Sequence, residues 1–321
     1  MTGINFLHNN SQSQTFLSEV LLLGFQGLYS YRFLVFAIFI IVYTFILCGN
    51  ILIILVIVSN GLLHSPMYFF VCNLSLLEIV CTTNIIPVML QLLFRNRIRL
   101  SLFGCLVQLY LFGTFSATEL FLLTVMSYDR YLAICRPLHY SSVMHFRFCC
   151  YLVLASWTTS FLIVSVVIGF LSQQDFCGNI NTIDHFFCDL IPVLGLSCSD
   201  TSNVKMIIYL LCSLSVVSPF LFITMTYVFI IRCVLNIQSV TGKKKAFSTC
   251  SSHLTVVYTY HITLFMVYVV PTNGSSLEVN KVLSLLYTVI TPILNPFIYS
   301  LNNREIKAAI HVNIIRRFKG K

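Results

Sequence analysis

Charged residues are scarce in this sequence. Only 9% of its 321 residues are Asp, Glu, Lys or Arg, whereas 58% are hydrophobic and the mean hydropathy is +0.90. Soluble domains carry about 25% charged residues, because their surfaces face water. The shortage of charge therefore excludes an ordinary soluble protein and implies that much of the chain lies in lipid.

The sequence also lacks the local patterns of the common enzyme classes. It contains no glycine-rich nucleotide loop, no pair of carboxylates like those of glycosidases and no Gly-x-Ser-x-Gly turn. Its Ser, His and Asp residues are spread along the chain as expected from their numbers alone, so they do not indicate a catalytic triad. We therefore predict a protein that is not an enzyme and that needs no cofactor, apart from a candidate sodium ion considered below.

Long uncharged stretches take the place of the missing charges. A helix needs about 20 residues to cross about 30 Å of hydrocarbon. Stretches of this kind, free or nearly free of charge, lie at 33–58, 66–94, 100–128, 148–171, 206–231, 246–270 and 282–301. They are apolar all round rather than alternating, which favours helices over a β-barrel. The predicted fold is an all-α integral membrane protein, a seven-transmembrane helix bundle.

Lysine and arginine are distributed unequally between the two sides that seven spans define. Thirteen of the 19 lie on the side opposite the N-terminus, which the positive-inside rule assigns to the cytoplasm. Membrane orientation thus explains the net charge of +9, and no nucleic-acid partner is needed. The expected parts are an extracellular N-terminal segment at 1–28, a membrane domain at 29–301, and a cytoplasmic amphipathic helix and tail at 302–321.

The N-terminal region has no Lys or Arg in its first 31 residues and no apolar core followed by a cleavage site. A removable signal peptide is therefore not expected, and the first span acts as its own signal anchor. An extracellular N-terminus makes Asn9, in the triplet Asn-Asn-Ser, a glycosylation acceptor. Chance occurrence is the alternative for any such triplet.

Four cysteines fall on the predicted outer side, where disulfides persist. Cys105 lies at the outer end of the third span, and Cys177, Cys188 and Cys198 lie in the long segment before the fifth. Four cysteines allow three pairings, and the residues alone do not choose between them.

Two acidic residues lie inside predicted spans, Glu78 in the second and Glu119 in the third. A lone charge within the bilayer is costly, so each needs a partner, an ion or a proton. A secondary transporter that uses both as a proton relay is one interpretation. Transporters are usually built from inverted repeats, however, and this sequence shows no internal repeat.

Six motifs occur in order along the chain. They are GN at 49–50, LHSPMYFF at 63–70, MSYDRYLAICRPLHY at 126–140, CSD at 198–200, KAFSTCSSHL at 245–254 and PILNPFIYSLNNREIKAAI at 292–310. With these motifs the chain resembles rhodopsin-type G-protein-coupled receptors of the vertebrate odorant receptor family. The resemblance implies a plasma-membrane receptor of olfactory neuron cilia. Such a receptor binds small, volatile organic molecules and activates a stimulatory, olfactory-type G protein that raises cyclic AMP.

The resemblance also identifies a coupling switch. Asp129 and Arg130 form a latch at the cytoplasmic end of the third helix, and the arginine freed by helix movement helps to form the G-protein cavity. The implied switch residues are Asp129, Arg130, Tyr131, Tyr227, Asn295, Pro296 and Tyr299. One alternative for the pair is a solvated surface contact. Another is a receptor-like protein that no longer signals, although the motifs are intact.

Two further features follow from the same resemblance. The implied disulfides are Cys105 with Cys188 and Cys177 with Cys198. Glu78 and Glu119, with Asn50 and Asn295, match the positions that surround a sodium ion or a water network in related receptors. Two carboxylates repel each other, so either sodium binds or at least one carboxyl is protonated.

Helix periodicity outward of Glu119 predicts the ligand pocket. Its expected lining residues are Phe112, Gly113, Ser116, Leu211, Cys212, Ser215, His261, Leu264, Phe265, Tyr268, Leu285 and Thr288. A mostly apolar cavity with a few hydroxyl groups suits a small molecule with one or two polar groups. His261 departs from the family's usual pattern and is expected to touch the ligand. Alternatively, it is a neutral histidine that bonds the backbone of a neighbouring helix and contributes only packing.

The segment after the seventh span is expected to form a short amphipathic helix on the inner leaflet. Ile306, Ala309, Ile310 and Ile314 fall near one face of such a helix, with basic residues around them. A disordered basic tail is the alternative.

Overall fold

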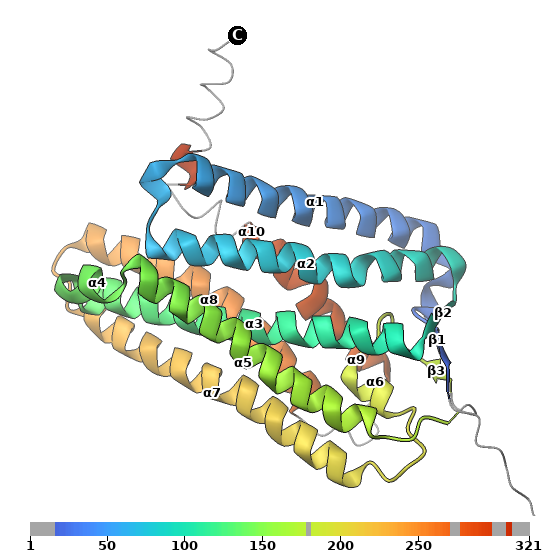
Figure 1. Ribbon diagram of the computed structural model, residues 1–321. Helices are drawn as coiled ribbons and strands as arrows, with labels where there is room; N and C mark the ends of the chain where they lie inside the picture. The colour runs from blue at the N-terminus through green and yellow to red at the C-terminus, as the bar shows by residue number, and fades with distance from the viewer. Residues whose placement is uncertain (1–16, 178–180, 270–276, 297–305, 310–321) are drawn as a thin grey trace, which may run out of the picture.

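Long helices lying side by side make up most of the molecule (Figure 1). The structure is a computed structural model, and it describes residues 17–177, 181–269, 277–296 and 306–309. Five of its described helices are long and apolar enough to cross a membrane: α1 (Arg32–Ser59), α2 (Pro66–Arg95), α3 (Leu102–Cys135), α5 (Phe146–Ser172) and α7 (Ser202–Leu235). They coincide with the first five predicted stretches, and each extends beyond its stretch at one end or both.

The remaining two predicted stretches are also helical where the structure describes them. The sixth corresponds to α8 (Val240–Tyr268), which contains more Ser, Thr and Lys than the other long helices. The seventh begins within α9 (Leu277–Leu285), which continues through one π-helical segment, η3 (Leu286–Ile290), into α10 (Thr291–Pro296). The prediction of a helical architecture is thus confirmed.

Helix α3 is the central element of the bundle, since it packs against α2, α5, α7 and α8. Many large apolar side chains of α1, α5 and α7 point outward instead and remain exposed, for example Leu34, Leu162 and Leu221. Exposed apolar surface of this extent is expected where helices face lipid rather than water.

A glycine permits the close approach of α1 and α10. A Cβ atom at Gly49 would lie 3.0 Å from Cβ of Pro296, which is tighter than most real Cβ contacts. A larger residue at position 49 would require Pro296 to shift by a few tenths of an ångström. Asn50, the next residue along α1, is thereby held close to the bundle interior, where it is buried.

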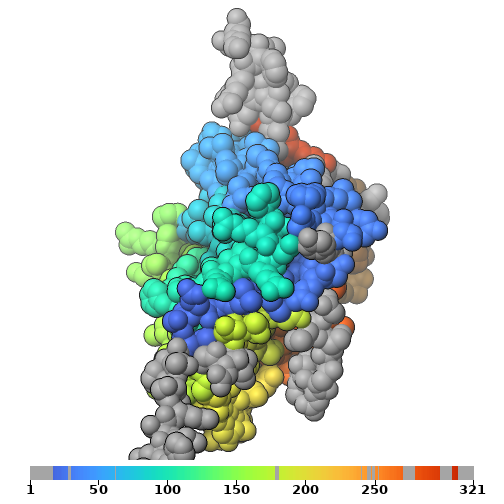
Figure 2. Space-filling model, turned by 90° about the vertical axis from the view of Figure 1, so that its right-hand side faces the viewer, coloured from blue at the N-terminus to red at the C-terminus, as the bar shows by residue number. Residues whose placement is uncertain are grey.

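A small sheet closes one end of the bundle (Figures 1 and 2). Its central strand β1 (Glu19–Leu22) pairs antiparallel with β2 (Ile98–Ser101) and parallel with β3 (Thr182–Ile183). In this register Val20 lies opposite Leu100, and Val20 and Leu22 are fully buried. The sheet therefore ties the segment before α1 to two loops distant in sequence. We call this the sheet end of the bundle.

Short helices occupy several connections, and none of them was predicted. The 3₁₀ segments η1 (Gln26–Tyr31) and η2 (Gly61–Leu63) flank α1, and α6 (Leu190–Leu194) lies at the sheet end. Helix α4 (Pro137–Val143) follows α3 at the opposite end of the bundle (Figure 1), which we call the α4 end.

Several predictions fall on residues that the structure does not describe. Asn9, Tyr299, Ile310 and Ile314 lie outside the described ranges, so their assignments stay predictions. Residues 306–309 are described and helical, with Ile306 and Ala309 buried while the residues between them are exposed. This short piece has the alternation expected of the amphipathic helix.

Candidate functional site

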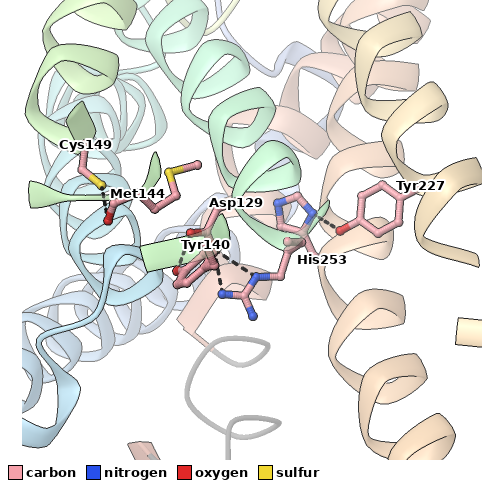
Figure 3. A network of polar contacts seen from close by, with 7 residues as sticks. Asp129, Tyr140, Met144, Cys149, Tyr227 and His253 are labelled. Atoms are coloured by element: carbon pink, nitrogen blue, oxygen red, sulfur yellow. Dashed lines mark hydrogen bonds and ion pairs between the residues drawn. The ribbon is translucent and has the colours of Figure 1, made fainter. Parts of the chain in front are cut away.

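The Asp129 and Arg130 pair lies near the α4 end, within the long helix α3 (Figure 3). Arg130 donates from Nη2 to Oδ2 of Asp129 at 2.8 Å and from Nε at 3.2 Å. The side chains are 17% exposed for Arg130 and 1% exposed for Asp129. This is a largely buried, charge-assisted contact rather than a solvated surface pair.

Helix α4 contributes a third member that the sequence analysis missed. The Tyr140 hydroxyl donates to Oδ1 of Asp129 at 2.8 Å, so both carboxylate oxygens have donors. Burial, together with the adjacent carboxylate, raises the pKa of the Tyr140 phenol, which therefore keeps its proton and remains a donor. Tyr140 is the last residue of the motif at 126–140, but the sequence does not show that its hydroxyl bonds Asp129.

The other switch residues within the described ranges lie on α3, α7 and α10. Tyr227 on α7 is buried, and its hydroxyl lies 2.6 Å from Nδ1 of His253 on α8 (Figure 3). Tyr131 stacks on Tyr128 and reaches Phe229 of α7 at 6.1 Å between ring centroids. These contacts join α3, α7 and α8. The structure also buries Asn295 and Pro296 on α10.

A cluster of buried polar side chains lies between α1, α2, α3 and α10. Both oxygens of Glu78 accept hydrogen bonds from amides, Oε2 from Asn50 at 3.0 Å and Oε1 from Asn295. Glu119 is buried on α3, close enough for its charge to act on Glu78. Among the described residues, Oδ1 of Asn50, Oδ1 of Asn295 and Oε1 of Glu119 are buried without a hydrogen-bond partner. Oxygen atoms of this kind are suitable ligands for a hard cation or a water molecule.

A cavity of about 100 Å³ lies between α3, α5, α7 and α8. Seven of the twelve predicted pocket residues line it: Phe112, Gly113, Ser116, Cys212, Ser215, Leu264 and Tyr268. Apolar side chains of α5, among them Val164 and Val167, form another wall, and Asp189 and Leu190 border it from the loop before α7. The contribution of α5 could not be predicted from the sequence, because apolar residues surround this helix and do not indicate which face lines a cavity.

The other five predicted pocket residues do not line this cavity. They are Leu211, His261, Phe265, Leu285 and Thr288. Phe265 is 41% exposed on the surface, and the Thr288 hydroxyl donates to the Ser284 carbonyl of its own helix. The π-helical segment η3, which begins directly after Leu285 and contains Thr288, departs from the 3.6-residue spacing by which these last two residues were chosen. Tyr287 instead stacks on Phe112, at 5.8 Å between centroids.

His261 is buried in the interior of α8. Its Nδ1 lies 2.9 Å from the Val257 carbonyl of the same helix, and its ring lies 5.8 Å from that of Phe220. This arrangement corresponds to the packing interpretation, except that the backbone partner belongs to its own helix. The geometry gives His261 no direct place in the cavity lining.

We expect His261→Phe to shift the potency of all agonists by a similar factor, below about tenfold, since one net hydrogen bond is worth about 1 kcal/mol. Dose-response curves for a series of agonists, at matched surface expression, would measure the shift. Potency shifts that differ strongly between agonists would show instead that His261 contacts the ligand.

The cavity is covered by a loop that a disulfide attaches to α3. Cys105 is bonded to Cys188, whose backbone N–H donates to Oε1 of Gln108 at 2.9 Å. Phe187 meets Phe112 edge to face at 5.0 Å between centroids. The loop carries a second disulfide, Cys177 to Cys198. Both pairs are those that the resemblance implied.

A carboxylate is fixed beside the cavity by hydroxyl groups from two helices. Asp189 accepts from the Tyr268 hydroxyl at 2.6 Å and from the Tyr287 hydroxyl at 3.5 Å, as well as from the Leu190 N–H at 2.7 Å. Burial raises its pKa to about 6, so at neutral pH it is still mainly ionised. Asp189 is a site residue that was not predicted from the sequence.

A buried ion pair fastens the same loop to α9. Nζ of Lys281 lies 2.7 Å from Oδ1 of Asp184, and the lysine side chain is only 2% exposed. Burial and the nearby lysine lower the pKa of His185 to about 3, so this histidine is neutral. The roof of the cavity is therefore held from α3 by a covalent bond and from α9 by charge.

We expect Gly113→Ala to reduce agonist potency according to ligand size. Gly113 lines the cavity, and a Cβ there would lie 3.3 Å from Cγ1 of Val164, so the methyl group narrows the space. The largest agonists should lose about tenfold in potency, because one methylene changes binding by at least that factor. Gly169→Ala on α5 is the matched control, since its Cβ would meet nothing within 4 Å. Equal losses for small and large agonists would contradict the assignment.

Comparison with known proteins gives matches along nearly the whole chain. A family model described as "Olfactory receptor" matches residues 39–317. Human olfactory receptor 13A1 is 44% identical over 298 residues, covering 93% of this chain and 90% of that receptor. Human olfactory receptor 11L1 is 45% identical over 313 residues, with 95% and 94% covered. Mouse olfactory receptor 6B9 is 42% identical over 301 residues, with 94% and 95% covered.

Proposed function

The chain belongs to the olfactory receptor family, and from this premise we propose that it couples odorant binding to a stimulatory, olfactory-type G protein that raises cyclic AMP. Membership makes it an odorant-sensing receptor and not an enzyme. The observation that carries the proposal is that one bundle contains both parts of a receptor. The cavity lies under the disulfide-held loop, and the closed Asp129 and Arg130 latch lies near the α4 end. The transporter alternative has no support from the relatives.

The ligand class follows from the lining of the cavity. Most of its surface is apolar, with hydroxyl groups from Ser116, Ser215 and Tyr268 and a carboxylate from Asp189. The Ser215 hydroxyl donates to carbonyls of its own helix, which leaves its oxygen available as an acceptor. Small, volatile organic molecules with one or two polar groups fit such a site, because a few fixed polar atoms orient a mostly apolar ligand.

The proposed topology has seven spans, with α8 as the sixth and α9 to α10 within the seventh. The sheet end then faces the exterior and the α4 end faces the cytoplasm. Both disulfides lie in elements of the sheet end, and disulfides persist in oxidising compartments. The proposed location is the plasma membrane of olfactory neuron cilia, with lipid around the exposed apolar faces.

Coupling uses the latch near the α4 end. Separation of α3 from α7 would break the contact of Tyr131 with Phe229 and open a space beside Arg130. Arg130 would then leave Asp129 and help to form the cavity that accepts the terminal helix of the G protein. Tyr227, which bonds His253 in this closed arrangement, is the aromatic residue expected to move toward the freed arginine. Tyr299 is proposed for the same role by resemblance.

A sodium ion bound near Glu78 and Glu119 is part of the proposal. Three buried oxygen atoms without partners among the described residues, on Asn50, Asn295 and Glu119, support a cation or water site there. The ion would offset the repulsion between the two carboxylates. Protonation of one glutamate is the competing account, and replacing sodium by choline in the assay buffer distinguishes them through a change in agonist affinity.

A cyclic AMP assay with a diverse odorant panel tests the function. Cells that display the receptor and contain a stimulatory G protein should respond to at least one odorant class, and cells with an unrelated receptor should not respond. Deleting the stimulatory G protein should remove the response. A response that persists without this G protein would contradict the proposed coupling.

Asn9→Gln is expected to remove one glycan and to increase mobility on a gel, because the proposed topology places Asn9 outside the cell. Asn73→Gln is the matched control, since Asn73 lies inside α2 and should carry no glycan. An Asn9 variant that migrates like a glycosidase-sensitive wild type would contradict the assignment.

A further inference from the structure

A second cavity, of about 310 Å³, lies at the sheet end between the beginning of α1 and the end of α2. It shares no lining residue with the cavity under the disulfide-held loop. Its polar lining comes from Gln26, Arg32, Asn96 and Arg97. Two guanidinium groups and two amides are all able to donate hydrogen bonds, so this side of the cavity suits an oxyanion.

Positive charge exceeds negative charge around this cavity. Arg95 and Arg97 form no ion pair with any residue that the structure describes. Arg99 faces Glu19 at 4.0 Å, and both side chains are largely exposed, so this pair has little strength. Glu19 is the only acidic residue on the strands and helix ends that surround the site. The surplus charge calls for an anionic partner.

The other side of the cavity is apolar. Leu92 and Leu93 of α2, together with Phe25, line it, while the neighbouring Phe94 and Phe33 are exposed on the outer surface of the helices. Figure 2 shows the end of α2 and β2 in teal next to β1 and α1 in blue. A ligand here would meet donors on one side and hydrocarbon on the other.

The position of the site along the helices matches a membrane boundary. Arg32 begins α1 and Arg95 ends α2, and between residues 33 and 94 Glu78 is the only Asp, Glu, Lys or Arg. Arginines that flank such apolar segments lie at the level of lipid phosphates. Basic pockets between transmembrane helices on the cytoplasmic side of membranes bind lipid headgroups, and the donors of this cavity offer the same chemistry at the sheet end.

We propose that this cavity binds the phosphate group of a phospholipid, held by Arg32 and Arg97, while the acyl chains lie along the apolar surface of α1 and α2. The planar guanidinium groups suit a phosphate because each can donate two parallel hydrogen bonds. Phe25, on the cavity wall, stacks on Phe186 at 5.2 Å. The lipid therefore braces the loop that covers the odorant cavity against the first two helices.

Titration of the purified full-length receptor in an uncharged detergent with dioctanoyl phosphatidic acid tests the proposal, with native mass spectrometry as the readout. One equivalent should bind saturably, and Arg97→Gln should weaken binding by about tenfold or more, the loss expected for a charge-assisted contact. Arg32→Gln should behave similarly. Arg99→Gln is the matched control, because Arg99 lies on the same surface but outside the lining, and should change binding little.

Two comparison ligands make the outcome decisive. Dioctanoylglycerol, which has the chains but no phosphate, should not bind with this stoichiometry, and inorganic phosphate alone should bind far more weakly. Equal binding of phosphatidic acid to wild type and Arg97→Gln would mean general lipid contact only and would overturn the proposal. Inorganic phosphate binding as tightly as the lipid would overturn it too, in favour of a free-anion site. Arg97 is exposed, so the Arg97→Gln receptor is expected to fold. A normal agonist response of this variant would verify its folding.

Discussion

Arg130→Ala is expected to abolish agonist-driven cyclic AMP while the receptor still reaches the cell surface. Arg130 is held by Asp129 in the closed state and, once released, would supply the positive group of the G-protein cavity. Alanine removes this group, so agonist binding has no route to the G protein. Loss of a partner from a buried ion pair costs about 3 to 5 kcal/mol. The cost in stability should lie at the lower end of this range, because the Tyr140 hydroxyl still donates to Asp129 in the variant.

Surface labelling and cyclic AMP measured in the same cells would separate coupling from folding. Arg147→Ala is the matched control, because Arg147 is an exposed arginine near the same end of the bundle and makes no ion pair with any described residue. Its response should equal that of wild type. An Arg130→Ala receptor that is displayed normally and signals at full strength would show that the latch does not take part in coupling.

The positions of the helices could be predicted from the sequence because the signal is local. Uncharged stretches long enough to cross a bilayer leave little choice of structure, since every backbone group must find its partner within the helix. The ends were less certain. The third uncharged stretch ends at 128, whereas α3 continues to Cys135 and includes Asp129 and Arg130, which pair with each other inside the bundle.

The sheet could not be predicted, since its pairing is entirely non-local. The strand Glu19–Leu22 pairs with β2 almost 80 residues later in the sequence and with β3 about 160 residues later. Four residues are also too few for an alternating pattern to predict a strand. Tyr140 was missed for a related reason. Its partner Asp129 lies across the turn from α3 to α4, and no residue between them signals that turn's direction.

The candidate pocket was predicted in part, and its errors have physical causes. The three predicted residues on α3 line the cavity, as do Cys212 and Ser215 on α7, because regular 3.6-residue periodicity holds there; Leu211, the third residue predicted on α7, does not line it. Leu285 and Thr288 do not line this cavity; the π-helical segment η3 begins directly after Leu285, and Tyr287 within it stacks on Phe112. Asp189 could not be found, because a loop residue has no periodicity and its position depends on the Cys105 to Cys188 bond.

Cys105→Ser is expected to block maturation of the receptor, and Cys188→Ser should have the same effect. The bond closes a loop between residues 83 apart in sequence, and in the chain-entropy description its loss costs about 4 to 5 kcal/mol. It also positions Phe187 against Phe112 and Asp189 beneath Tyr268, so the roof of the cavity loses its attachment to α3. Both sulfur atoms are fully buried, and a lone serine hydroxyl there would lack a partner.

Cys177→Ser provides the matched comparison, because its bond to Cys198 joins residues only 21 apart and is worth about 3 kcal/mol in the same description. It should therefore leave more receptor at the surface than Cys105→Ser does. Surface display and glycan maturation of the variants would measure the difference, with Cys48→Ser, an exposed free cysteine on α1, as the neutral control. If Cys105→Ser matures as well as Cys48→Ser, the loop must be held chiefly by other contacts. The buried pair of Lys281 with Asp184 would then be the next interaction to remove.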